Sequence, residues 1–187
     1  MPEIFCVKTL RTSVLYSLVA LALAAATTAI CLVPGQGPAV AEEAKAVSTD
    51  PLWAASFKDL TGTLQPMSQY KGKVTVLYFW AAWCESCRIE APQMSALQEK
   101  YKDKDLAVVG VAVDNADTVK AFVAKNKLTN PTVYGGKDAM GLMKALGNDK
   151  GAFPFAIVID RDGKIVKTKL GDAPNDSIDG FVASLIG

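Results

Sequence analysis

The 187-residue chain contains no histidine, and only four of its residues are cysteine. The lack of histidine removes the commonest general base and the commonest metal ligand of proteins, so any chemistry must come from cysteine, carboxylate, lysine or tyrosine. The chain also lacks an excess of charge of either sign, because it has 20 basic and 19 acidic residues. The chain therefore lacks the basic footprint of a nucleic-acid binder, and we expect no nucleic-acid partner. A glycine-rich phosphate loop and signatures for haem or flavin are absent as well, so no cofactor is expected.

The first 41 residues predict an export signal or a membrane anchor. Lys8 and Arg11 precede a stretch, 12–41, without a charged residue, and the segment 14–33 is apolar. This apolar segment is longer than the roughly 7–15 residues of a cleaved signal and about long enough to span a bilayer. The small residues Ala39 and Ala41 fit a cleavage site before Glu42, so cleavage and retention as an anchor both remain open. Either route places the remainder in the periplasm or an equivalent extracytoplasmic compartment, where disulfides persist.

The segment 83–87, Trp-Cys-Glu-Ser-Cys, lies where a buried-strand pattern gives way to a helical one. Two cysteines with this spacing can close a small disulfide, and the partial positive charge of a helix N-terminus favours the thiolate of the first. We expect Cys84 to be the more exposed sulfur, which attacks a partner disulfide, and Cys87 to resolve the mixed disulfide from beneath. The sequence therefore predicts a redox-active pair.

The helix that follows Cys84 has one buried arc, and Glu90 falls within it one turn beyond Cys87. Burial favours the protonated form of a carboxyl, so Glu90 is a candidate to hold or pass the proton of Cys87. The alternative is a structural role, in which Glu90 reaches the rim and pairs with Arg88 or a lysine. Ile89 points away from the arc and is a candidate for a docking patch.

The rest of the pattern predicts an α/β domain over 53–187, preceded by a linker at 42–52. Apolar runs at 74–80 and 106–113 flank the cysteine helix and predict a right-handed strand-helix-strand unit. The further predicted elements are a helix around 119–123, a strand at 132–134, a helix at 138–146 with Asp138 near its N-cap, an antiparallel hairpin of 155–160 and 164–170, and a last helix after Pro174.

The stretch 79–92 resembles the active-site segment of the TlpA/ResA/CcmG group of exported or membrane-tethered thioredoxin-like proteins. The resemblance covers most of 53–187 and extends to 111–114 and to Phe153-Pro154 ahead of a strand. It implies a thioredoxin-like fold, a central mixed sheet flanked by helices, with a central strand-helix insert that 132–146 matches.

The resemblance also assigns roles to residues. Pro154 corresponds to the cis-proline that faces the dithiol and leaves the backbone of Phe153 free to pair with a substrate strand. The alternative for Pro154 is an ordinary proline at the start of a strand. Trp83 corresponds to the indole beside the nucleophile, so Trp83, Phe153 and Ile89 are candidates for substrate binding. A glutamate at the place of Glu90 is associated in this family with the proton of the second cysteine.

The implied function is a thiol-disulfide oxidoreductase that reduces protein disulfides, for example in cytochrome c or oxidase maturation, and is re-reduced by a membrane electron donor. The motif itself does not fix the reduction potential. A Cu(I) chaperone with two thiolate ligands and a peroxiredoxin-like peroxidase remain open. No zinc site is expected, because zinc needs four ligands and the other cysteines, Cys6 and Cys31, both lie in the leader.

Overall fold

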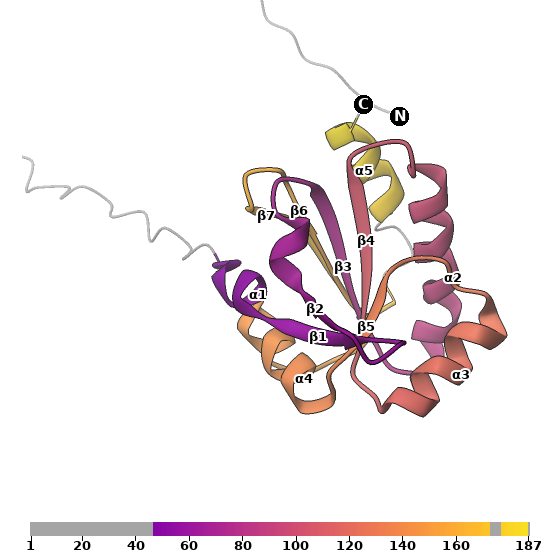
Figure 1. Cartoon of the computed structure of the whole chain (residues 1–187). Helices are drawn as coiled ribbons and strands as arrows, with labels where there is room; N and C mark the ends of the chain where they lie inside the picture. Colours follow the sequence, from indigo (N-terminus) through magenta and orange to yellow (C-terminus); the bar gives the residue numbers. More distant parts are fainter. Residues whose placement is uncertain (1–46, 173–176, 187) are drawn as a thin grey trace, which may run out of the picture. The chain divides into compact units, whose positions relative to one another are not determined.

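The computed structural model describes residues 47–172 and 177–186 (Figure 1). Within them, seven strands form one mixed sheet in the order β2-β1-β5-β4-β3-β6-β7. The strands are β1 (Ser56–Asp59), β2 (Leu64–Pro66), β3 (Val74–Trp80), β4 (Leu106–Ala112), β5 (Thr132–Tyr134), β6 (Phe155–Ile159) and β7 (Ile165–Leu170). The helices are α1 (Asp50–Ala54), the short 3-10 helix η1 (Met67–Tyr70), α2 (Glu85–Lys100), α3 (Ala116–Asn126), α4 (Gly136–Ala145) and α5 (Ile178–Ile186).

The predicted leader, 1–41, lies outside the described residues. None of the described helices combines the length and the apolar character needed to cross a membrane. α1 begins within the segment that the sequence predicts as a linker, and its Leu52 is fully buried.

β3 and β4 form the centre of the sheet, and all seven residues of each strand are buried. Such burial is typical of parallel strands that are covered on both faces. The two strands pair in parallel from Val74 opposite Leu106 to Trp80 opposite Ala112, which confirms the predicted strand-helix-strand unit with α2 as its crossover. β5 is parallel to β4, whereas β1, β2, β6 and β7 are antiparallel to their neighbours.

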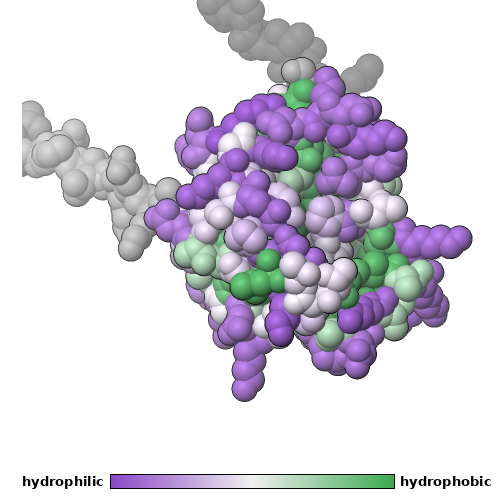
Figure 2. Space-filling model, in the orientation of Figure 1, coloured by the Kyte–Doolittle hydropathy of each residue, from purple (hydrophilic) through white to green (hydrophobic). Residues whose placement is uncertain are grey.

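Helices cover both faces of the sheet (Figure 1). α2, α3 and α5 pack on one face, where Trp80 contacts Phe122 with ring centroids 4.9 Å apart. α1, η1 and α4 pack on the other face, around the stacked rings of Phe79 and Phe155. Figure 2 shows mostly hydrophilic residues on the surface turned toward the viewer, with hydrophobic residues in small separate patches.

Two parts of the fold differ from the sequence prediction. The hairpin of β1 and β2 was not predicted, although β1 pairs with β5 and so extends the sheet. α4 begins at Gly136, two residues before the predicted start, with Gly135 as its N-cap residue, and Asp138 lies in its first turn, close to the N-cap as predicted. The β6–β7 hairpin and the insert of β5 and α4 agree with the prediction.

Candidate active site

The site lies at the edge of the sheet where β3 ends and α2 begins (Figure 1). Cys84 is the N-cap residue of α2, and its sulfur is bonded to that of Cys87 in a disulfide with Cα atoms 5.2 Å apart. The backbone N–H of Cys87 also donates a hydrogen bond of 3.2 Å to the Sγ of Cys84. Cys84 is 9% exposed and Cys87 is 0% exposed. The cysteine at the start of the helix is therefore the one that solvent or a partner can reach.

A buried ion pair lies beneath the disulfide. Glu90 and Lys169 are 6% and 8% exposed, and the ammonium group of Lys169 donates to Oε1 of Glu90. The other carboxylate oxygen, Oε2, is buried and has no hydrogen-bond partner among the described residues. The predicted position of Glu90 on the buried arc of α2 is confirmed. Glu90 pairs with a lysine, as in the structural alternative, but it does so inside the protein and not at the rim.

The register of three strands places the groups that surround Glu90. Tyr78 of β3 lies opposite Ala156 of β6, and Ala156 lies opposite Lys169 of β7. These three residues form one row across the face that α2 covers. The hydroxyl of Tyr78 donates to the carbonyl oxygen of Cys87 at 3.3 Å. Burial of the ring, together with the negative charge of Glu90, raises the pKa of Tyr78 above its ordinary value, so Tyr78 is a neutral donor.

An apolar surface flanks the disulfide. The bond between Phe153 and Pro154 is cis, as the resemblance implied. The ring of Trp83 meets that of Phe153 edge to face, with centroids 5.5 Å apart. Five large apolar side chains of the described residues are exposed, and Trp83 at 68% and Ile89 at 64% are the two most exposed of them. Both lie within five residues of Cys84 in the sequence, so the two most exposed apolar side chains belong to the segment that carries the reactive sulfur.

The sequence matches the Redoxin family over residues 39–185. This chain belongs to the Redoxin family. It is 31% identical over 129 residues to the thiol-disulfide oxidoreductase ResA of Bacillus thuringiensis (strain Al Hakam), a match that covers 68% of this chain and 72% of the relative. It is 34% identical over 120 residues to the thioredoxin-like protein YneN of Bacillus subtilis (strain 168), covering 62% of this chain and 67% of YneN.

Solved structures agree with this assignment. A secreted Mycobacterium tuberculosis disulfide oxidoreductase homologous to E. coli DsbE superimposes with a TM-score of 0.60 at 26% identity, over 73% of this chain and 99% of that one. A Chlorobium tepidum protein described as a putative thiol:disulfide interchange protein DsbE gives a TM-score of 0.61 at 27% identity, over 71% and 93%. The thioredoxin-like fold predicted from the sequence is confirmed, and the Redoxin-family chain is a thiol-disulfide oxidoreductase.

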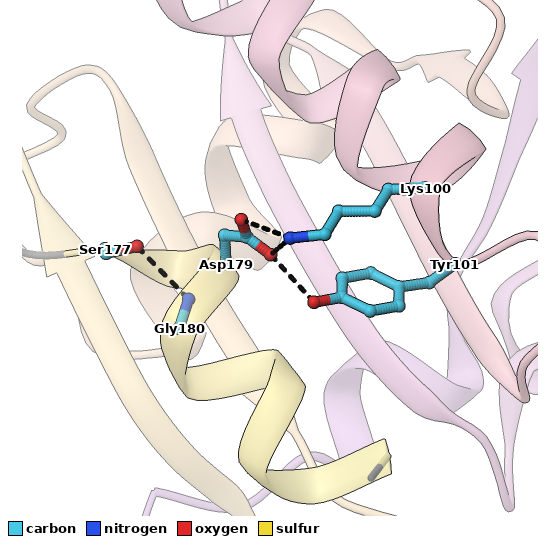
Figure 3. A network of polar contacts seen from close by, with 5 residues as sticks. All are labelled: Lys100, Tyr101, Ser177, Asp179 and Gly180. Atoms are coloured by element: carbon cyan, nitrogen blue, oxygen red, sulfur yellow. Dashed lines mark hydrogen bonds and ion pairs between the residues drawn. The ribbon is translucent and has the colours of Figure 1, made fainter.

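A groove of about 360 Å³ runs from the active site of this Redoxin-family protein along α2 toward α5. Its lining includes Ser86, Glu90, Met94, Lys169, Asp172 and Asp179. Figure 3 shows how α5 is held against the end of α2, because Asp179 accepts hydrogen bonds from Lys100 and from the hydroxyl of Tyr101. The hydrogen bond from Lys100 lowers the pKa of Asp179, so Asp179 carries a negative charge at neutral pH.

Lys169 and Tyr78 belong to this site, and the sequence analysis assigned neither of them to it. Glu90 was the sequence signal for such partners, because a carboxylate on a buried helix face requires a cation or hydrogen-bond donors from another element. Within 47–172 and 177–186, no cluster of three histidine, cysteine, aspartate or glutamate side chains is arranged to hold a metal ion.

Proposed function

We propose that this Redoxin-family protein is an exported reductase of protein disulfides. The observation that carries the proposal is the Cys84–Cys87 disulfide at the N-terminus of α2, in which Cys84 is 9% exposed and Cys87 is fully buried. A helix N-terminus stabilises a thiolate, and the sulfur that is accessible is the one that can attack a second protein. Pro154 in its cis form lies next to Phe153, whose ring packs against Trp83 beside the attacking sulfur.

The reaction begins from the reduced pair. The Cys84 thiolate attacks one sulfur of a substrate disulfide, the substrate S–S bond breaks, and the second substrate sulfur leaves as a thiolate. The Cys87 thiol then gives up its proton and attacks the Sγ of Cys84, which releases the first substrate sulfur. The substrate gains two electrons and two protons, and Cys84 and Cys87 end as a disulfide. A membrane dithiol donor then restores the reduced pair in the same way.

Glu90 is suited to take the proton of Cys87. It lies one turn along the same helix, a spacing that brings side chains within about 5–6 Å at their Cβ atoms. In the disulfide form Cys87 has no S–H group, and the Oε2 atom of Glu90 has no partner among the described residues. Reduction creates an S–H donor one helical turn from this acceptor. The carboxylate then accepts the proton of Cys87 and later returns it to a leaving substrate thiolate.

Substrate docking follows from the exposed apolar surface. Trp83 and Ile89 offer large exposed side chains that line an open groove together with Glu85, Arg88 and Asn126. By the resemblance, the backbone of Phe153 beside cis-Pro154 pairs with an extended segment that carries the substrate cysteine. A protein disulfide in an exposed, extended segment therefore fits this face.

The compartment and the pathway form the finer part of the proposal. The apolar leader with Lys8 and Arg11 ahead of it supports export, by a cleaved signal or by an anchor at 14–33. The M. tuberculosis relative is described as secreted. The resemblance to the TlpA/ResA/CcmG group favours substrates in cytochrome c or oxidase maturation. A protein that remains in the cytoplasm after expression in a bacterium would contradict export, and the intact mass distinguishes a start at Glu42 from a retained anchor.

Trapping tests the assignment of the two sulfurs. In the full chain with Cys6 and Cys31 replaced by serine, Cys87→Ala should form a stable mixed disulfide through Cys84 with a purified disulfide protein such as insulin. The matched variant Cys84→Ala should form far less adduct, because Cys87 is buried. Equal trapping through either sulfur would refute the assigned roles. Tight Cu(I) binding without insulin reduction would favour the Cu(I) chaperone over the proposed function. Peroxide consumption that is faster than insulin reduction would favour the peroxidase.

A further inference from the structure

Lys169 is the one buried lysine among the described residues, and it lies beneath the active site in contact with Glu90. We propose that Lys169 is a positioning residue that supplies the counter-charge for proton transfer between Cys87 and Glu90. It holds Glu90 as a carboxylate while Cys87 is a thiol, and it stabilises the Cys87 thiolate once the proton has moved to Glu90. This inference rests on the proposed role of Glu90 in disulfide exchange.

The sheet places Lys169 for this task. Tyr78, Ala156 and Lys169 occupy one row on β3, β6 and β7, and neighbouring strands lie about 4.8 Å apart. The small side chain of Ala156 separates the two long ones. The side chain of Glu90 extends from α2 toward this row and accepts a hydrogen bond from the ammonium group of Lys169. A larger residue in the middle of the row would occupy the space that the carboxylate and the ammonium group share.

The other titratable groups near Glu90 leave Lys169 as its counter-ion. Tyr78 on β3 is neutral, since burial and the charge of Glu90 raise its pKa. Across the groove, Asp172 and Asp179 are both acidic. Asp179 is already bound by Lys100 and Tyr101 (Figure 3). Among the described residues, the only ion pair found for Glu90 is the one with Lys169.

Charge balance gives the physical reason. With Lys169 present, the buried site is neutral both before and after the proton moves, because one ammonium group faces one negative group in each state. Without Lys169, the site carries a net negative charge in both states, and an unpaired buried charge is costly. Removing the ammonium group therefore disfavours every state in which Cys87 or Glu90 carries a negative charge, and the Cys87 thiolate is one of these states.

The expected size of the effect follows from the distance. One helical turn from Cys87 to Glu90 plus the hydrogen bond to Lys169 corresponds to a separation of about 7–10 Å between Cys87 and the ammonium group. At an effective dielectric constant of about 20, a unit charge at that distance shifts a titration by roughly one to two pH units. At a pH below the midpoint, a shift of that size lowers the thiolate fraction of Cys87, and with it the rate of resolution, by about 10- to 100-fold.

A double-mutant cycle in the full chain tests the proposal, with Cys6 and Cys31 replaced by serine. The variants are Lys169→Met, Glu90→Gln, their combination, and Lys164→Met as a control for loss of an exposed lysine from the same hairpin. The reduced proteins are labelled with ¹³C at cysteine Cβ, and the Cys87 titration is followed by NMR. Lys169→Met should move the Cys87 midpoint to higher pH by about one to two units. Glu90→Gln should move it to lower pH, and the combined variant should lie near the parent, as should Lys164→Met.

The rate of resolution provides the second readout. A mixed disulfide between Cys84 and glutathione is formed, and release of glutathione by Cys87 is timed across the pH range. Lys169→Met should be slower by at least about 10-fold at pH 7 and recover at high pH, whereas a lysine with a purely packing role would leave the pH profile unmoved. If Lys169→Met does not fold, the effect of removing Lys169 is measured by comparing the combined variant with Glu90→Gln alone. The combined variant buries neither the carboxylate nor the ammonium group.

The outcomes distinguish failure of the inference about Lys169 from failure of the proposed role of Glu90. If Glu90→Gln shifts the Cys87 titration and Lys169→Met does not, the inference about Lys169 is wrong and the proposed function stands. If neither variant shifts it, Glu90 has no part in exchange and both proposals lose that step. A combined variant whose Cys87 midpoint lies as far from the parent as that of Lys169→Met alone would also overturn the inference, because loss of the carboxylate should cancel loss of its counter-charge.

Discussion

Replacing Trp83 by alanine tests whether the apolar surface beside the disulfide docks protein substrates. Trp83 is 68% exposed. A tryptophan buries at most about 250 Å², so about 170 Å² remains available to a partner. At about 25 cal/mol per Å² this area corresponds to an upper limit of about 4 kcal/mol of docking energy. Ordering of the partner and incomplete burial reduce it to about 1–3 kcal/mol, which predicts a loss of about 5- to 150-fold in kcat/KM.

The assay compares two substrates for the same variant. Trp83→Ala should lose kcat/KM toward insulin and keep most of its rate toward glutathione disulfide, which is too small to cover the patch. The free energy of unfolding should fall by no more than about 1.5 kcal/mol, because the edge-to-face contact with Phe153 is the aromatic contact that is lost.

Leu64→Ala is the matched control for this experiment. Leu64 is 61% exposed on β2, four strand positions from β3, and its replacement should leave both rates unchanged. Equal losses on both substrates would show that Trp83 acts on the chemistry of the sulfur. An equal loss in Leu64→Ala would show that exposed apolar area matters wherever it lies. Either result would refute the docking argument.

Two further predictions concern stability, one for a pair of glycines and one for Asp59. Gly135→Ala should destabilise the fold by about 1–3 kcal/mol, because its Cβ would lie 2.4 Å from the buried ring of Phe57. Gly141 lies in α4, and a Cβ added there would meet nothing within 4 Å, so Gly141→Ala should stabilise the fold by about 0.5–1 kcal/mol. Chemical denaturation measures both changes, and a change of the same sign in the two variants would contradict the packing argument. Hydrogen bonds from Thr61 and then Gln65 lower the pKa of Asp59 from 3.8 to about 2. Asp59 therefore contributes stability above pH 3.8 that is lost as the pH falls toward 2, so the advantage of the parent over Asp59→Asn should shrink across that window, and a constant difference would argue against it.

The centre of the fold and the sulfur pair could be predicted because their signals are local and strong. β3 and β4 are continuous apolar runs, and this pattern has few interpretations in an α/β domain. The cysteine motif lies at the junction of such a run and a helix. The cis form of the bond before Pro154 came only from the resemblance, since nothing in the residues themselves selects the isomer.

The hairpin of β1 and β2 escaped prediction because its signal is weak. β1 has four residues, of which Phe57 alone is buried, and β2 has three residues and ends in Pro66. β1 pairs with β5 and the edge strand β2 pairs with β1, so both strands owe their structure to this pairing and not to an apolar pattern of their own. Sequence periodicity contains little of that information.

Lys169 escaped prediction for a different reason, which is a change of register inside β7. Simple alternation from Val166, which packs on the α2 side of the sheet, would turn Leu170 toward α2 and Lys169 away from it. The pairing between β6 and β7 shifts between Val158 and Ile159, so that one extra residue of β7 lies between its partners. A bulge of this kind exchanges the two faces of the strand beyond it. Lys169 is therefore buried under Glu90 while Leu170 is 44% exposed, and the counter-charge of the active site depends on an irregularity that no period-2 pattern contains.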